Sequence, residues 1–411
     1  MSDIRDILIV GAGQAGGCAA AALRSEGFTG RIVLAGAEPY RPYERPPLSK
    51  EVLADASADD AIFLHKPEFH DSLGLEWHPN LEIVHIDTER RSAASSDGRA
   101  FPFDRCLIAT GGRARRLPGV ADNLPNVFHL RTLDDARRLR ERLLPGSSAV
   151  VIGAGFLGLE FAGVAARKGV SVTVLEAGEQ ILGRTAPRLF ADWLAACYEK
   201  EGVRILCGVT LRRLEADANG TTVTLADGQE LKADFTLVAI GQEPNVTLAR
   251  GAGIALDNGI AVDARCETSV PGIFSIGDCA SHPSAFLGRR VRLESWQSAQ
   301  EQARVAARAM LGQEACYDAV PWFWSDQLGL NIQMLGLPDP SYSYCVRGDP
   351  DSRKFLVFGC GDRGLRYALA VNSGGDIRPL RNLLEANAAV DAATLMDTTR
   401  SIREIAKTAL S

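Results

Sequence analysis

The sequence lacks the features that would tie its chemistry to a metal ion, a disulfide or a membrane. Its nine cysteines form no C-x-x-C pair, and none of them are grouped at the spacing of zinc ligands. The histidines at 65, 70, 78 and 85 also lack metal-site spacing, so we predict no metal centre. No apolar run approaches the ~18 residues of a membrane span, and no cleavable leader precedes the first strand. We therefore expect a cytoplasmic protein.

The chain also has no excess of positive charge. Its 45 basic and 51 acidic residues give a net charge of −6, which argues against bulk binding of nucleic acid. The hydrophobic fraction of 46% and the charged fraction of 23% are typical of a globular protein. A length of 411 residues favours two or three domains, each large enough to bury a core.

What the sequence does contain is a dinucleotide-binding pattern in residues 150–176. An apolar strand leads into G-x-G-x-x-G at Gly153, Gly155 and Gly158, a helix follows, and a second apolar strand ends on Glu176. The three glycines permit a tight turn, the close approach of a pyrophosphate and close packing of the helix. The acid would accept hydrogen bonds from a ribose 2′-OH and repel a 2′-phosphate, so the pattern predicts NADH rather than NADPH.

A second copy of the pattern occupies the start of the chain. Residues 7–10 lead into Gly11, Gly13 and Gly16, an Ala-rich helix follows, and residues 31–35 form the second strand. The strand-end acid is less clear in this copy: Glu38 is the nearest carboxylate, and it is either a ribose contact or a solvated loop residue. Two such units predict two dinucleotides, and the usual pairing of a flavin with a nicotinamide indicates an oxidoreductase.

A proline-rich loop, PYRPYERPPLSKE, follows at residues 39–51. Its four prolines exclude a helix through most of the segment and predict a stiff, extended loop. Such a loop would hold Arg45 and Lys50 in fixed places against an anionic cofactor. The alternative is a rigid surface connector with solvated charges.

The motif PYERPPLSK after a dinucleotide unit resembles the flavin loop of NADH-dependent ferredoxin reductases. These are the reductase components of bacterial ring-hydroxylating dioxygenases and haem-thiolate monooxygenases, akin to putidaredoxin and rubredoxin reductases and, more distantly, to apoptosis-inducing factor. CLIATGG at 106–112, GIFSIGDCA at 272–280 and PWFWSDQLGLNIQMLG at 321–336 resemble later segments of the same family. The resemblance implies FAD and NADH as cofactors and a 2Fe–2S ferredoxin as the electron acceptor.

The resemblance also implies roles for single residues. Lys50 would lie by the central ring of the flavin and pair with Glu160, and a lysine there would stabilise the negative charge that arrives with a hydride. A nearby carboxylate would keep that lysine charged. The alternative for Glu160 is a carboxylate favoured by a helix N-terminus, and the alternative for Trp296 is a core aromatic. The catalytic candidates are thus Lys50 and Glu160, and the candidate cofactor-binding residues are Gly11, Gly13, Ala15, Gly16, Ala37, Glu38, Arg45, Pro47, Lys50, Ile83, Ala109, Thr110, Gly111, Arg131, Gly153, Gly155, Phe156, Leu157, Gly158, Glu160, Glu176, Arg184, Ile240, Gly241, Gly277, Asp278 and Trp296.

We therefore expect an α/β protein with two Rossmann-like dinucleotide-binding domains of three-layer ββα type and a C-terminal α+β domain. The expected FAD domain is discontinuous, and the boundaries are 1–112 with 244–316 for FAD, 113–243 for NADH and 317–411 for the C-terminal domain. Asn219-Gly220 and Asp227-Gly228 predict turns of an antiparallel excursion within the NADH domain. The later strands and helices of the C-terminal domain are expected at 341–372 and 376–408.

Three functions remain open at this point. The first is an NADH:ferredoxin reductase, a monomer or weak homodimer, in which arginines 289, 290 and 292 steer an acidic ferredoxin. The second is a flavoprotein reductase of rubredoxin, a disulfide or a peroxide, although the last two would need a redox-active cysteine that the sequence does not place beside the flavin. The third is a redox sensor like apoptosis-inducing factor.

Overall fold

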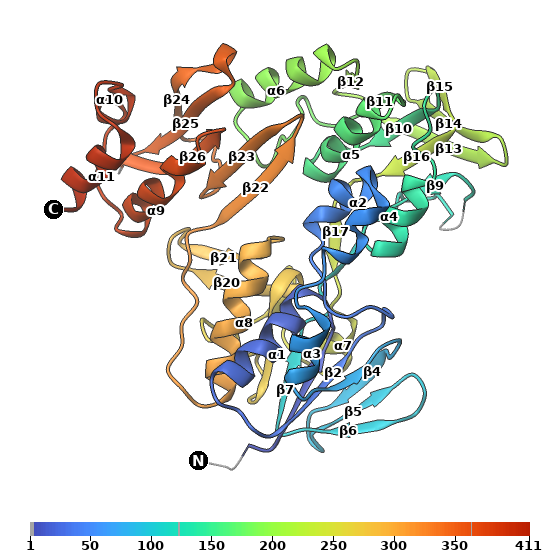
Figure 1. Cartoon of the computed structure of the whole chain (residues 1–411), viewed down its shortest axis with the longest axis vertical. Helices are drawn as coiled ribbons and strands as arrows, with labels where there is room; N and C mark the ends of the chain where they lie inside the picture. Colours follow the sequence, from blue (N-terminus) through green and yellow to red (C-terminus); the bar gives the residue numbers. More distant parts are fainter. Residues whose placement is uncertain (1–3, 122–123, 363) are drawn as a thin grey trace. The chain divides into compact units, whose positions relative to one another are not determined.

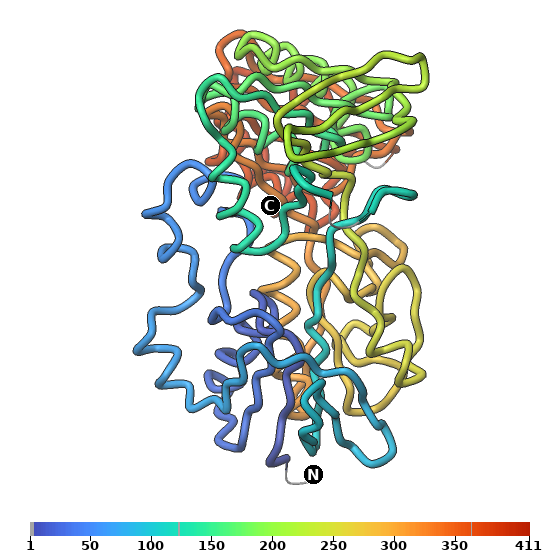
Figure 2. The backbone as a smooth tube through the Cα atoms, turned by 90° about the vertical axis from the view of Figure 1, so that its right-hand side faces the viewer, coloured from blue at the N-terminus to red at the C-terminus, as the bar shows by residue number. Residues whose placement is uncertain are grey.

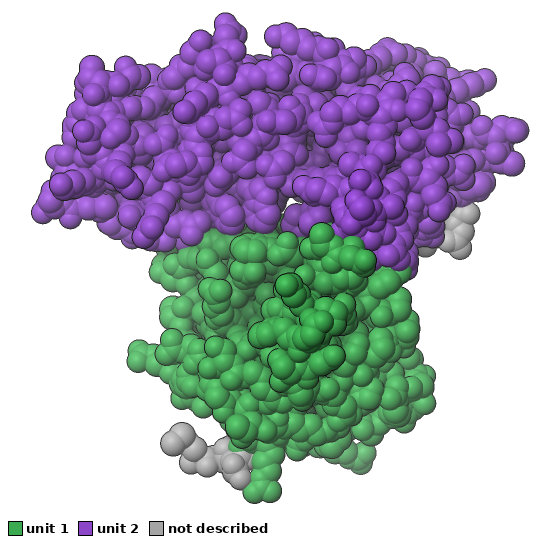
Figure 3. Space-filling model, viewed as in Figure 1, with its two compact units in different colours: residues 1–45, 60–113, 243–319 green, residues 46–59, 114–242, 320–411 purple. Residues whose placement is uncertain are grey.

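The computed structural model describes residues 4–121, 124–362 and 364–411, and the chain divides into two compact units (Figure 3). Unit 1 consists of residues 1–45, 60–113 and 243–319, and unit 2 of residues 46–59, 114–242 and 320–411. In Figure 2 the blue-to-cyan part of the chain, without residues 46–59, and the yellow-to-orange part form unit 1 together. Each unit is therefore assembled from segments far apart in the sequence.

Unit 1 is built on a five-stranded parallel sheet. Its strand order is β19-β7-β1-β2-β3. These strands span Ile273–Ser275, Arg105–Ile108, Asp6–Val10, Arg31–Ala35 and Glu76–His78. The central strands are almost continuously apolar because both faces of the sheet are covered.

Two helices cover one face of this sheet and a second sheet covers the other. Helices α1 (Gln14–Ser25) and α8 (Trp296–Met310) lie side by side, and small buried residues of both, such as Ala19 and Ala303, let them approach closely (Figure 1). The opposite face packs against the antiparallel sheet of β4 (Ile83–Asp87), β5 (Ser92–Ser95) and β6 (Ala100–Pro102). This confirms the predicted three-layer ββα arrangement.

Unit 2 contains a second parallel sheet of the same kind. Its strand order is β12-β11-β10-β16-β9, with bounds Arg204–Leu206, Ser171–Leu175, Ser148–Ile152, Phe235–Val238 and Val127–Phe128. Helices α5 (Phe156–Arg167) and α6 (Arg188–Lys200) accompany it. The antiparallel ribbon β13 (Leu211–Asp217), β14 (Gly220–Leu225) and β15 (Glu230–Ala233) packs on it, which confirms both predicted turns.

Unit 2 ends in an antiparallel sheet with helices. The strand order is β22-β23-β26-β25-β24, with bounds Trp322–Gln327, Leu330–Leu335, Gly364–Val371, Lys354–Gly361 and Ser343–Asp349. Helices α9 (Ile377–Glu385), α10 (Ala392–Met396) and α11 (Ile402–Leu410) follow the last strand. The strands and helices predicted for the C-terminal segment are confirmed.

The proline-rich loop differs from the prediction in one respect. Pro46–Ser49 form a short 3-10 helix and Glu51–Ala54 form α2, so this part is not extended. Proline is compatible with the first turn of a helix because its fixed φ suits that turn and its missing N–H would have no partner there. Segment 46–59 is joined to α4 (Leu133–Arg140) by Asp59, whose carboxylate binds Arg137 and Arg140 at 2.6–2.8 Å.

Further short α-helices and strands lie between these elements. They are α3 (Pro67–Ser72), α7 (Thr247–Gly251), β8 (Gly112–Ala114), β17 (Gln242–Pro244), β18 (Ile260–Ala261), β20 (Ala280–Ser284) and β21 (Arg289–Val291). Among the helices of residues 4–121, 124–362 and 364–411, none is both long enough and apolar enough to cross a membrane.

Candidate functional site

The first glycine loop joins β1 to α1 in unit 1. A Cβ on Gly11 would lie 2.3 Å from the carbonyl oxygen of Ala109, and one on Gly16 would lie 1.9 Å from the carbonyl oxygen of Gly11. A Cβ on Gly13 would meet only the end of the Arg45 side chain, at 3.9 Å. The first and third glycines are thus required by packing, whereas the second leaves a clear approach to the backbone. A pyrophosphate needs this geometry at a helix N-terminus.

The second loop, between β10 and α5 in unit 2, has the same geometry. A Cβ on Gly153 would lie 2.4 Å from the oxygen of Ala239, and one on Gly158 would lie 2.2 Å from the oxygen of Gly153. Apart from its neighbours in the chain, no atom lies within 4 Å of the Cβ position of Gly155. Gly155 is the N-cap of α5, and because it has no side chain it offers no cap to the first N–H groups of the helix. The loop also lies where the order of the sheet reverses beside β10, the usual place for a ligand in such sheets.

Glu176, at the carboxyl end of β11, is held against this second loop. Its carboxylate accepts hydrogen bonds from the backbone N–H of Ala154 and of Gly178, each at 2.8 Å. After the end of β16, on the other side of β10, the backbone nitrogen of Ile240 lies 3.3 Å from the Cβ position of Gly153. A guanidinium nitrogen of Arg184 lies 3.6 Å from the Cβ position of Gly241. The structure therefore brings the predicted NADH residues of unit 2 together, with Phe156 and Leu157 half-buried in the first turn of α5.

In unit 1, the predicted flavin residues also meet at strand ends. The Cβ position of Gly277 lies 3.0 Å from Cβ of Ala15, so the Gly277–Asp278 turn packs on the first glycine helix. The turn is held by Gln302 of α8, whose side-chain oxygen accepts from the N–H of Gly277 at 2.8 Å. After β7, Thr110 donates to the carbonyl of Asn245 at 2.8 Å. Sequence reasoning did not identify Gln302, because a buried glutamine has no local motif.

Arg45, Glu38 and Trp296 have specific partners within unit 1. One Glu38 oxygen binds a guanidinium nitrogen of Arg45 at 2.6 Å and the other accepts from the Tyr43 hydroxyl. The indole N–H of Trp296 donates to Glu44 at 2.9 Å. Ala37 is exposed just after β2, whereas Ile83 is 4% exposed in the core beneath the sheet. Because both Glu38 oxygens already have donors, a ribose hydroxyl at Glu38 would compete with Arg45 and Tyr43.

Lys50, Pro47 and Arg131 belong to unit 2. Nζ of Lys50 lies 3.5 Å from Glu160 and 3.5 Å from Asp326, so the pairing of Lys50 with Glu160 that the resemblance implied is present. Glu160 is 8% exposed, and burial raises the pKa of its carboxyl against the opposing effect of Lys50. Pro47 lies in the 3-10 helix before Lys50, and Arg131 directly precedes the N-cap of α4.

The cysteines are free thiols. Cys279 follows Asp278 directly, and its burial raises the pKa of the thiol, which works against the thiolate form that redox exchange requires. Among the residues that the structure describes, no group of three or more His, Cys, Asp or Glu side chains is arranged to hold a metal ion.

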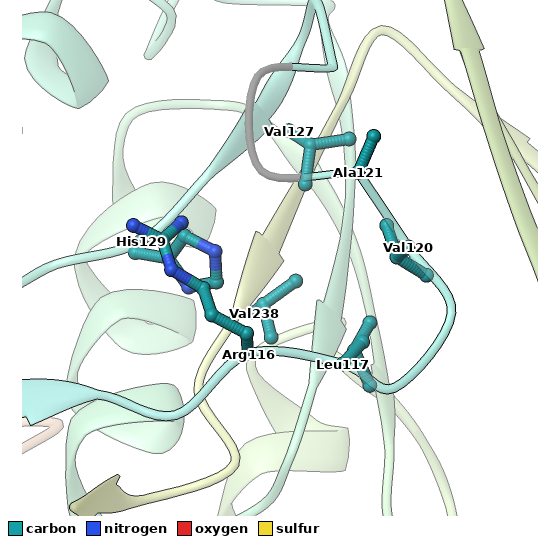
Figure 4. Close-up of a pocket in the computed structure, with 7 residues that line it drawn as sticks. All are labelled: Arg116, Leu117, Val120, Ala121, Val127, His129 and Val238. Atoms are coloured by element: carbon teal, nitrogen blue, oxygen red, sulfur yellow. The ribbon is translucent and has the colours of Figure 1, made fainter.

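A small pocket opens beside the parallel sheet of unit 2 (Figure 4). It contains none of the candidate residues named from the sequence. Its lining residues are Arg116, Leu117, Val120, Ala121, Val127, His129 and Val238.

Comparisons with known proteins agree with this geometry. Residues 5–303 match the family described as pyridine nucleotide-disulphide oxidoreductase, and residues 322–406 match the family described as reductase C-terminal. The chain is 38% identical, over 96% of its length and 98% of the relative, to the ferredoxin–NAD(+) reductase component of the anthranilate 1,2-dioxygenase system from Burkholderia cepacia. It is also 38% identical to rhodocoxin reductase from Rhodococcus erythropolis, over 92% of this chain and 89% of the relative.

Solved structures point the same way. The reductase chain of a covalent putidaredoxin reductase–putidaredoxin complex superposes with a TM-score of 0.95 at 33% identity, with 99% of both chains covered. The ferredoxin reductase for the CYP199A2 system from Rhodopseudomonas palustris gives a TM-score of 0.94 at 34% identity, with 98% of this chain and 99% of that chain covered. The chain therefore belongs to the pyridine nucleotide-disulphide oxidoreductases, and within them to the FAD-dependent NADH:ferredoxin reductases that its sequence motifs resemble.

Proposed function

We propose that this protein is the reductase component of a bacterial oxygenase system, which takes electrons from NADH and delivers them through FAD to a ferredoxin. The observation that carries the proposal is the pair of glycine loops, each with an unobstructed second glycine at a helix N-terminus. The family to which the chain belongs, and relatives that are ferredoxin–NAD(+) reductase components, support the same activity.

We assign NADH to the second loop. The N–H groups at the start of α5 would hold the pyrophosphate, and Gly155 leaves room for it. Glu176 would accept from the ribose hydroxyls while keeping its backbone bonds, and its charge would repel a 2′-phosphate. Phe156, Leu157, Arg184, Ile240 and Gly241 would complete the site, within the proposed domain 113–243.

We assign FAD to the first loop, within the proposed domain 1–112 and 244–316. FAD held there would supply the chemistry of accepting a hydride from NADH and releasing the electrons one at a time, and the chain would supply orientation and electrostatics. Gly13 leaves the pyrophosphate approach open, and Asp278, held by the turn at Gly277, would accept from a ribitol hydroxyl. Lys50, paired with Glu160, would stabilise negative charge at the ring system. The remaining flavin contacts proposed from the sequence are Ala15, Gly16, Ala37, Glu38, Arg45, Pro47, Ile83, Ala109, Thr110, Gly111, Arg131 and Trp296.

The acceptor we propose is an acidic 2Fe–2S ferredoxin, with this protein acting as a monomer or weak homodimer in the cytoplasm, where NADH is available. The relatives named above include a ferredoxin–NAD(+) reductase component and a ferredoxin reductase, and a putidaredoxin complex is among the similar structures. Arg290 and Arg292 are engaged within unit 1, by the carbonyls of Val262 and Asp278. Arg289 is exposed, so it is the member of this group most available to a partner.

The test is a sequence of assays on purified protein. A yellow protein that is bleached by NADH under nitrogen, and that reduces cytochrome c only when a 2Fe–2S ferredoxin is added, is the expected result. A colourless protein that does not take up FAD would overturn the proposal. Turnover with a disulfide or a peroxide instead of ferredoxin would identify a different reductase, and slow turnover with dimerisation on reduction would identify a redox sensor.

A further inference from the structure

The C-terminal sheet of unit 2 reaches the Lys50–Glu160 pair through strand β22. Ser325 is fully buried on this strand, and its hydroxyl donates to Glu160. We infer that Ser325 is a positioning residue, by which the C-terminal segment keeps Glu160 ionised and directed at Lys50. This inference rests on the proposed role of Lys50 at the flavin.

Glu160 is enclosed by three donors from two separate segments. One carboxylate oxygen accepts from the Ser325 hydroxyl and lies 3.5 Å from Nζ of Lys50, and the other oxygen accepts from the Ser49 hydroxyl. The side chains of Glu160 and Lys50 are 8% and 10% exposed. Water therefore contributes little here, and the ionised carboxylate depends on these three groups.

Gln327 determines which way the Ser325 hydroxyl donates its hydrogen bond. The side-chain amide of Gln327 donates to the Ser325 oxygen at 2.8 Å, so the hydroxyl hydrogen of Ser325 remains for Glu160. The carbonyl oxygen of that amide lies 2.9 Å from the hydroxyl of Tyr198, which lies 2.7 Å from the carbonyl of Leu159. Burial raises the pKa of Tyr198 well above its usual range, so it stays a neutral donor. The chain from α6 to Glu160 is buried throughout.

Lys50 has a second carboxylate within reach. Asp326, next to Ser325 on β22, lies 3.5 Å from Nζ. Unlike the buried Glu160, its side chain is 47% exposed. Asn331 fixes it with a 2.8 Å hydrogen bond, and the ring of Trp324 lies 5.8 Å from the ammonium. Protonation of Glu160 would leave Asp326 as the carboxylate paired with Lys50. The ionisation of Glu160 therefore decides whether Lys50 is held by both carboxylates or by Asp326 alone.

The groups around Glu160 determine the direction in which loss of the Ser325 hydroxyl would move the pKa of its carboxyl. Burial raises the pKa of its carboxyl, while Lys50, Ser325 and Ser49 lower it. The titratable groups that face this pair from other elements are Tyr198 on α6 and Asp326 on β22, both described above. Loss of the Ser325 hydroxyl removes one lowering influence, so Glu160 becomes protonated at a higher pH.

The experiment compares the full-length FAD-loaded wild type with Ser325→Ala, Ser325→Thr and the control Ser343→Ala. Thr keeps the hydroxyl, and Ser343 is exposed on β24 of the same sheet. The first readout is an infrared pH titration of the protonated-carboxyl band that is lost in Glu160→Gln. The second is the pH dependence of flavin reduction by NADH in a stopped-flow instrument. We expect Ser325→Ala to move the Glu160 titration up by about one pH unit, a tenfold change in the ratio of the two forms, and to move the acid limb of the rate with it.

Ser325→Thr and Ser343→Ala should titrate as the wild type does. An unmoved titration in Ser325→Ala, or an equal movement in Ser343→Ala, would overturn the inference. If Ser325→Ala does not fold, Gln327→Leu takes its place: it keeps Ser325 but removes the donor behind it, and should move the titration in the same direction. Failure of the wild type to be reduced by NADH would refute the proposed function, while the infrared titration would still decide the role of Ser325.

Discussion

Alanine at the second or the third glycine of the NADH loop should separate cofactor binding from folding. The two positions lie three residues apart at the start of α5, but their surroundings differ. The Cβ of Gly158→Ala would be placed 2.2 Å from the backbone oxygen of Gly153 and 3.3 Å from a Val151 methyl, whereas that of Gly155→Ala meets nothing within 4 Å. Alanine should therefore mainly lower the stability of the protein at Gly158 and mainly weaken NADH binding at Gly155.

The magnitudes follow from these contacts. At Gly158 the obstacle is backbone, which cannot rotate away, so we expect a loss of about 1–3 kcal/mol in the free energy of unfolding. At Gly155, φ is −78° and ψ is −179°, which alanine adopts readily. The entropy gained from a stiffer unfolded chain offsets the poorer N-cap, and the net change should stay within about 1 kcal/mol. The new methyl would nevertheless stand where the pyrophosphate approaches, and the loss of one or two charge-assisted hydrogen bonds would raise KM for NADH about 10- to 100-fold.

The assay pairs urea unfolding, followed by circular dichroism, with KM for NADH measured with ferricyanide as the acceptor. Gly13→Ala is the matched control, because the Cβ position of Gly13 in the first loop meets only the end of the Arg45 side chain, at 3.9 Å; it should weaken FAD retention and leave KM for NADH unchanged. The reasoning fails if Gly155→Ala loses as much stability as Gly158→Ala while its KM for NADH stays at the wild-type value.

Three further results are expected. Glu176→Ala should raise KM for NADH and lower the preference for NADH over NADPH about tenfold or more, in steady-state assays with both nucleotides; an unchanged preference would contradict the assigned role. Glu44→Ala removes the acceptor of the Trp296 indole and should weaken FAD binding about fivefold, measured by flavin fluorescence; tight binding as in the wild type would show that this hydrogen bond does not support the flavin site. Hydrogen bonds from two α4 arginines hold the pKa of Asp59 below its usual range, so its stabilisation is present above about pH 4 and is lost as pH falls further. Asp59→Asn should thus lower stability by about 1 kcal/mol at pH 7, and the difference in Tm between the variant and the wild type should shrink as pH falls below about 4. A difference in Tm that does not depend on pH would contradict this role of Asp59.

Local patterns in the sequence were enough to predict the elements that depend on neighbours in the chain. The two glycine loops, the acid at the end of β11 and the turns at Asn219-Gly220 and Asp227-Gly228 follow from backbone geometry and hydrophobic periodicity within about 30 residues. The short strands of the C-terminal sheet were predictable for the same reason.

Contacts between distant segments were decided only by the tertiary structure. Ser49 and Ser325 lie 111 and 165 residues from Glu160, and no spacing in the sequence links a buried serine to a carboxylate. The engagement of Arg290 by backbone carbonyls and the 3-10 turn at Pro46–Ser49 likewise depend on what packs against them. Hydrogen-bond partners of buried polar groups are chosen by proximity in the folded chain, because burial forces each such group to find one wherever the fold places it.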